Sequence, residues 1–301
     1  MKKIIFLFIA ITAITAISCK KESSSSNAAS FLYFGAWRDT GFGKIDLLNG
    51  YTVTYLAKGA ASGFPDKGVL GVDYNPNTGD FYLTLERTNG KIFKLTPSGT
   101  LSVLFDETDG VNDPTAIIYN TQNGKLYWEN SGDGKIYVGN ADGSGTPNSL
   151  FGGTPIDATG YGMAINYRDN KIYYTNWDNI HVGNLNGSGT PTLLYDYIAD
   201  TVESPSSIVL DVDNNKIYWT DENTNNVAVG NLDGTGNIQL LFTSAADGVD
   251  RSDGLAIDKV SNKIYWTETG SFNRIRMGNL DGSGSPTLLL NDVESYILRL
   301  K

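Results

Sequence analysis

The side chains that most often perform nucleophilic or zinc chemistry are scarce in this chain. Among its 301 residues there is one cysteine, Cys19, and one histidine, His181. A catalytic serine or cysteine needs a base beside it, and zinc sites of the His/Cys type need several such ligands. We expect His181 at a strand position exposed on one face of a sheet. No Ser-His-Asp triad, Cys-His pair or zinc site of this type can therefore be assembled.

A calcium loop is the next chemical possibility. Residues 211–215 (DVDNN) have the alternating oxygen ligands that open such a loop, and Glu222 stands at the twelfth position. Lys216 replaces the required glycine, however, and residues 216–220 have the composition of a strand. We therefore predict a strand-turn-strand corner here, with no metal and no cofactor.

Carboxylates, arginines and aromatic rings are the remaining groups that could bind or react. They matter only if the fold brings them together, because most are far apart in sequence. The candidates are Trp37, Arg38, Phe64, Glu86, Arg87, Glu129, Tyr161, Trp177, Asp221, Glu222, Arg251, Asp253 and Glu268.

A repeated phrase indicates which elements position these residues. Residues 125–128 (KLYW), 171–174 (KIYY), 216–220 (KIYWT) and 263–267 (KIYWT) are copies of it, and weaker copies occur upstream. The tyrosines of the six copies lie 45–49 residues apart, a period typical of repeat architectures; they are Tyr33, Tyr82, Tyr127, Tyr173, Tyr218 and Tyr265.

Each repeat has the pattern of four short strands. In residues 254–290 we expect strands at 254–258, 263–267, 274–280 and 287–290, separated by polar or glycine-rich turns. No helical apolar period occurs after residue 30. We therefore predict an all-β fold, a six-bladed β-propeller of four-stranded antiparallel blades, spanning residues 31–301.

The first and last segments of this domain complement each other. The chain enters at Phe31 in a second-strand phrase, so the first blade lacks its innermost strand. Residues 295–300 (SYILRL) form an extra strand after the last repeat. We predict that this C-terminal strand completes the first blade and closes the ring, since closure removes exposed sheet edges.

The motifs themselves resemble a known family. Residues 218–221 form a complete YWTD motif, and residues 255–258 (LAID) and 279–282 (NLDG) match its surroundings. The chain resembles the YWTD six-bladed propellers of low-density-lipoprotein receptors, whose units are called class B repeats. Other copies depart from the motif, ending in Glu129-Asn130, Thr175-Asn176 and Thr267-Glu268. In the family these residues pack blades and brace loops, so the resemblance implies the fold and no chemistry.

The propeller frame predicts where a site lies. Loops after the second and fourth strands of each blade share one face around the channel mouth, and the candidate residues fall on those loops. Aromatic and arginine side chains dominate the energetics of recognition surfaces. We expect a non-catalytic, monomeric module that binds a protein, peptide or glycan through this loop face. Two alternatives stay open, namely a metal-dependent hydrolase or lactonase-like enzyme with carboxylates at the channel mouth, and a purely architectural component.

The first thirty residues predict export. Lys2 and Lys3 precede an apolar run that ends in small residues before Cys19, as in a secretory signal peptide. Residues 1–18 are the expected signal, and the position of Cys19 resembles that of the lipidated cysteine in a bacterial lipobox. Residues 19–30 (CKKESSSSNAAS) then form a lipidated, flexible tether. We expect a lipid-anchored protein of the bacterial cell envelope, at the outer membrane and either periplasmic or surface-exposed.

The net charge of the chain limits the classes of partner that it can bind. Without residues 1–18 the chain has 21 basic and 33 acidic residues, a formal charge of −12. Such a surface repels nucleic acid and anionic headgroups. We therefore expect no nucleic-acid partner, and contact with a membrane through the N-terminal anchor alone.

Overall fold

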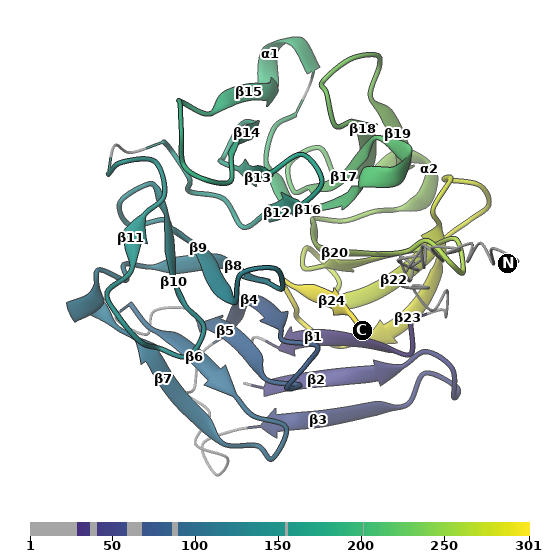
Figure 1. Ribbon diagram of the computed structural model, residues 1–301. Coiled ribbons are helices and arrows are strands. Elements are labelled where there is room, and N and C mark those ends of the chain that lie inside the picture. Colours follow the sequence, from purple (N-terminus) through teal and green to yellow (C-terminus); the bar gives the residue numbers. More distant parts are fainter. Residues whose placement is uncertain (1–28, 37–40, 59–67, 86–89, 154–155, 201) are drawn as a thin grey trace, which may run out of the picture.

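The computed structural model describes residues 29–36, 41–58, 68–85, 90–153, 156–200 and 202–301. These residues form six sheets, each of four antiparallel strands, arranged in a ring (Figure 1). The prediction of a six-bladed propeller is confirmed. The predicted signal peptide and Cys19 lie outside the described residues.

The blades follow chain order, except that the first takes its innermost strand from the C-terminal end. From the channel outward, blade 1 contains β24 (Leu298–Leu300), β1 (Phe31–Ala36), β2 (Gly41–Asp46) and β3 (Val53–Lys58). Blade 2 contains β4 (Val69–Tyr74), β5 (Phe81–Leu85), β6 (Ile92–Leu95) and β7 (Leu101–Phe105). Blade 3 contains β8 (Pro114–Asn120), β9 (Lys125–Asn130), β10 (Lys135–Asn140) and β11 (Asn148–Ser149).

The second half of the chain repeats the arrangement. Blade 4 contains β12 (Met163–Asn166), β13 (Lys171–Thr175), β14 (Ile180–Asn184) and β15 (Thr192–Tyr195). Blade 5 contains β16 (Pro205–Asp211), β17 (Lys216–Asp221), β18 (Asn226–Asn231) and β19 (Gln239–Thr243). Blade 6 contains β20 (Ser252–Asp258), β21 (Lys263–Glu268), β22 (Arg274–Asn279) and β23 (Thr287–Asn291). Short turns of helix, η2 (Glu107–Asp109), η3 (Val212–Asn214), α1 (Tyr197–Asp200) and α2 (Ser244–Asp247), lie between strands.

The C-terminal strand closes the ring as predicted. β24 pairs antiparallel with β1, with Leu32 opposite Leu300 and Phe34 opposite Leu298. In Figure 1 the yellow end of the chain lies beside the purple beginning. The ring therefore joins the two ends of the domain through backbone hydrogen bonds.

The repeated phrase forms the second strand of each blade and is buried on both faces. In β17 every residue after Lys216 is buried, because each blade packs between two others. Trp128, Trp219 and Trp266 stack on an aromatic ring of the fourth strand in the preceding blade. The ring centroids are 5.6 Å apart for Phe105–Trp128 and 4.9 Å apart for Phe242–Trp266.

The segment that resembles a calcium loop and the single histidine both have structural roles. Asp211 ends β16, η3 turns the chain, and Lys216 begins β17, so the predicted corner replaces a calcium loop. His181 lies within β14 and is half-buried, stacked on Tyr174 with centroids 5.2 Å apart. Within the described ranges, no group of three or more His, Cys, Asp or Glu side chains is arranged to hold a metal. No helix in those ranges is long and apolar enough to cross a membrane.

Candidate functional site

The loops after the second and fourth strands meet at one end of the channel, as the propeller frame predicts. We call this end the mouth. Five of the thirteen candidate residues, Trp37, Arg38, Phe64, Glu86 and Arg87, lie outside the described residues. The other eight lie at the mouth ends of their blades, but they divide into buried and accessible groups.

Asp221 is buried and braces a loop. One carboxylate oxygen accepts hydrogen bonds from the backbone N–H groups of Glu203 (2.9 Å) and Ser204 (3.3 Å). The other oxygen accepts the N–H of Thr224 at 2.9 Å. The prediction that Asp221 belongs to the binding face is therefore wrong, because its carboxylate oxygens accept hydrogen bonds from the loop that enters β16 and the loop that leaves β17.

Glu268 occupies the matching position in blade 6 and is also buried. Its oxygens accept hydrogen bonds from Trp266 Nε1 (2.8 Å), Arg274 Nε (2.6 Å) and Arg276 Nη1 (3.2 Å). Two guanidinium groups thus neutralise the one carboxylate, and Glu268 is a structural residue that a ligand does not reach. The family resemblance implied this role for both acids.

Glu129 is a buried acid with an incomplete set of partners. Oε2 accepts the Thr115 hydroxyl at 3.3 Å, and Oε1 has no hydrogen-bond partner among the described residues. Burial raises the pKa of Glu129 well above its ordinary range, because the charged form loses its hydration without gaining a cation. Glu129 is therefore not an exposed recognition residue.

Asp253, Glu222 and Arg251 form the remaining charged group. Asp253 is fully buried, and one of its oxygens accepts the Thr269 hydroxyl. The Glu222 carboxylate lies within hydrogen-bonding reach of Asp253, so a bond between them forms only when one of the two carries a proton. Burial, and then repulsion by Glu222, raise the pKa of Asp253 well above its ordinary range. Arg251 Nη2 contacts Glu222 Oε2 at 3.1 Å.

Tyr161 and Trp177 form the accessible part of the mouth. Their rings meet edge to face with centroids 6.5 Å apart, and Trp177 is 58% exposed. Tyr161 also lines a cavity of about 190 Å³ between the innermost strands of blades 2 and 3, together with Leu70, Leu85, Asp113, Pro114, Thr115 and Ser131. We call this the mouth cavity.

The channel below the mouth is nearly filled. Its cavity is only about 40 Å³ and is lined by residues of the innermost strands such as Ile117, Ile208 and Leu298. A ligand therefore has room at the mouth cavity and against Trp177, but not within the channel. The sequence analysis did not include Thr115 and Ser131, although the repeat frame places both the start of each innermost strand and the loop after each second strand at the mouth.

Comparison with known proteins supports the fold alone. No protein-family model and no curated protein matches the sequence. A chain in the crystal structure of a nidogen/laminin complex has a TM-score of 0.74 at 15% identity, covering 90% of this chain and 97% of that one. A Bacteroides thetaiotaomicron VPI-5482 structural-genomics protein of unknown function has a TM-score of 0.59 at 13% identity, covering 76% of this chain and 59% of that one. The fold is thus the closed six-bladed propeller, with stacked Tyr-Trp phrases between its blades.

Proposed function

We propose that this protein is a non-catalytic binding module that recognises a protein, peptide or glycan at the mouth of its propeller. The observation that carries this proposal is Trp177, more than half exposed and braced edge-on by Tyr161 beside the mouth cavity. Contact between a large aromatic ring and water is energetically unfavourable. Exposed rings of this kind are common anchors of binding interfaces, where they contribute much of the binding free energy. The mouth cavity adds the Thr115 and Ser131 hydroxyls and the Asp113 side chain for polar contacts.

Two further points support a binding role. A propeller of this fold is found in a structure of a nidogen/laminin complex, so the fold is compatible with protein assembly. The chain's formal charge of −10 favours partners that are neutral or basic where they touch the mouth.

We propose that the module is held at the bacterial cell envelope, at the outer membrane, by a lipid on Cys19. The support is the order of a basic start, an apolar run, Cys19 and a serine-rich tether in the sequence. Conversion of Cys19 to serine should release the protein from the membrane fraction. Retention of this variant at the membrane would contradict the anchor.

The enzymatic alternative rests on Glu129 and Asp253, whose raised pKa values would suit proton transfer. Both carboxyls are fully buried, however, behind the hydroxyls of Thr115 and Thr269. A substrate at the mouth therefore does not reach either acid without a rearrangement of the loops, and binding is the function that the geometry supports best.

The proposal is tested by replacing Trp177 with alanine. Partners captured from envelope extract by the wild-type domain should bind the variant at least about tenfold more weakly, as is typical for an aromatic anchor. The melting temperature should change by no more than about 2 °C, because the side chain is largely solvent-exposed.

The matched control is Tyr51→Ala, an exposed aromatic residue (43%) in the turn between β2 and β3 on the opposite face. Its capture of partners should equal that of the wild type. Equal capture by Trp177→Ala and the wild type would place the interface elsewhere and overturn the proposal.

A further inference from the structure

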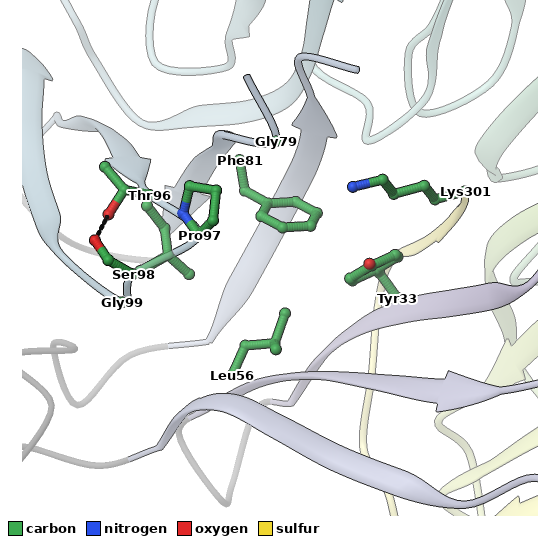
Figure 2. A pocket seen from close by; sticks show the side chains of 10 residues that line it. Tyr33, Leu56, Gly79, Phe81, Thr96, Pro97, Ser98, Gly99 and Lys301 are labelled. Atoms are coloured by element: carbon green, nitrogen blue, oxygen red, sulfur yellow. Dashed lines mark hydrogen bonds between the residues drawn. The ribbon is translucent and has the colours of Figure 1, made fainter. Parts of the chain in front are cut away.

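A second cavity lies on the face opposite the mouth, between blades 1 and 2. It measures about 280 Å³ and is lined by Tyr33, Leu56, Phe81, Leu95, residues 96–99 and Lys301 (Figure 2). Its walls are aromatic and aliphatic, and its rim is the turn that joins β6 to β7. We call it the basal cavity.

Four of the six repeated tyrosines have a hydrogen-bond partner for the hydroxyl, whereas Tyr33 and Tyr218 have none among the described residues. At equivalent positions the Tyr173 hydroxyl donates to the Leu232 carbonyl (3.2 Å), and the Tyr127 hydroxyl accepts from Asn123 (3.2 Å). Asn75 and Ser261 play similar roles for Tyr82 and Tyr265. Within the described ranges the Tyr33 hydroxyl has no such partner, although its ring is buried against Phe81 with centroids 4.8 Å apart. Tyr33 therefore presents a donor that the fold does not use.

The ammonium group of Lys301 is the second unused donor. Figure 2 shows the Lys301 side chain pointing towards the Phe81 ring, with Tyr33 beside it. Its Nζ lies 5.2 Å from the Tyr74 ring centroid and 5.9 Å from that of Phe81. No carboxylate in the described part of the chain forms an ion pair with it. The nearby Asp80 is already engaged by Lys94 at 3.3 Å and by the Thr78 hydroxyl at 2.9 Å.

The main chain at Lys301 is held by hydrogen bonds, which fix the point from which its exposed side chain extends beside the cavity. Lys301 N–H donates to the Phe31 carbonyl at 3.0 Å. Its carbonyl accepts the N–H groups of Ser30 and Phe31 at 3.0 and 3.1 Å. On the rim, the hydroxyls of Thr96 and Ser98 bond to each other at 2.8 Å, which leaves them partly satisfied.

We propose that the basal cavity binds a small carboxylate with an aromatic body. A cation and a hydroxyl donor without acceptors fit a carboxylate, and charge-assisted bonds of this kind are stronger than neutral ones. The walls of Phe81, Leu56 and Leu95 fit an apolar ring. The volume lies at the lower limit for ligand pockets, so the ligand is small. The site is independent of the function proposed for the mouth, because it lies at the other end of the strands.

The test is a nitrogen-15 NMR titration of the whole domain with sodium phenylacetate, compared with phenylacetamide as its neutral equivalent. Phenylacetate should give saturable shifts for amides of residues 31–33, 79–82, 96–99 and 299–301, with a dissociation constant in the low-millimolar range for a ligand of about ten non-hydrogen atoms. Phenylacetamide should bind roughly tenfold more weakly, because it lacks the charge.

Two substitutions assign the binding to the proposed groups. Lys301→Met keeps the apolar stem and removes the charge, and Tyr33→Phe removes only the hydroxyl. Each should weaken phenylacetate roughly fivefold or more and reduce its advantage over the amide. Tyr127→Phe, the equivalent change in blade 3, is the matched control and should leave the titration unchanged.

Three results would overturn the proposal: no saturable shifts at about 20 mM phenylacetate, equal binding of the amide, or unaltered binding by Lys301→Met. Because Lys301 is exposed, its variant is expected to fold, so this variant decides the outcome even if Tyr33→Phe is unstable.

Discussion

At position 129 the chain places a glutamate where blades 2, 4, 5 and 6 have a threonine. Thr175 shows what the threonine does, since its hydroxyl accepts the Gly162 N–H at 3.0 Å and donates to the Ser206 carbonyl of the next blade at 3.3 Å. Glu129 cannot donate when it is ionised, which explains why one oxygen lacks a partner and why its pKa is raised. The substitution thus makes folding sensitive to pH.

Glu129→Gln should stabilise the protein at neutral pH. A carboxyl whose pKa is raised in the folded state favours folding fully only below its unfolded pKa, and this contribution falls as the pH rises towards the folded value. The amide is neutral at all pH values and can donate, so we expect a gain on the order of 1–3 kcal/mol near pH 7 and none near pH 4. Urea unfolding of both proteins across this range measures the difference.

Glu107→Gln is the control for this experiment, since Glu107 is exposed in η2. It should show no pH-dependent gain over the wild type. A constant difference between Glu129→Gln and the wild type at all pH values would mean that Glu129 does not change its proton affinity on folding.

At the scale of the strand, neighbouring blades pack together through contacts between an aromatic side chain and a glycine. The aromatic residue that ends the fourth strand of one blade lies against a glycine in the third strand of the next. Phe105 reaches Gly139 in this way, and Phe242 reaches Gly278. A Cβ at position 139 would lie 2.9 Å from the Phe105 ring, closer than side chains pack. The glycine is therefore selected by the neighbouring blade and not by its own strand.

Gly139→Ala should destabilise the domain by about 1–3 kcal/mol through overpacking. Phe105→Leu removes the obstructing ring edge, so the double variant should lose less stability than the sum of the two single changes. A double-mutant cycle in urea measures the coupling. Additive losses would show that the ring and the glycine do not interact.

For the whole molecule, closure depends on the last strand. Besides its pairing with β1, β24 supplies Arg299, whose Nε lies 2.9 Å from Asp73 Oδ1 in blade 2. The other Asp73 oxygen accepts the Tyr119 N–H of blade 3 at 2.9 Å. Burial raises the pKa of Asp73, and the Arg299 charge offsets part of this rise. Three blades therefore meet at the buried Asp73 carboxylate, whose partner Arg299 is half-exposed.

Removal of residues 293–301 should lower the stability of all six blades together, because it exposes β1 and leaves Asp73 buried without its cation. Because Arg299 is half-exposed, water screens its pairing with Asp73, and most of the expected loss comes from the newly exposed sheet edge. Thermal unfolding should show a single transition at least about 10 °C lower. An excess of a peptide of residues 293–301 should restore part of the loss by mass action, whereas a scrambled peptide should not. An unchanged melting temperature would contradict closure by this strand.

The six-bladed architecture could be predicted from the sequence. The spacing of Tyr33 to Tyr265, the turn residues and the unpaired first and last strands predicted six blades and their closure, because these features depend on local strand and turn preferences repeated along the chain. The sequence also excluded the calcium loop at 211–222, because Lys216 belongs to a strand.

Which candidate residues are accessible depends on the packing between blades and could not be predicted from the sequence. From residue type alone, acidic side chains are expected to be exposed and a tryptophan to be buried. The structure shows the reverse, because Trp177 is exposed and four acids are buried, namely Asp221, Glu268, Glu129 and Asp253. The unused donors of Tyr33 and Lys301 also depend on contacts between residues far apart in the chain. The burial and the hydrogen-bond partners of these side chains depend on contacts between neighbouring blades. Such contacts join residues far apart in the chain, so a local sequence pattern does not predict them.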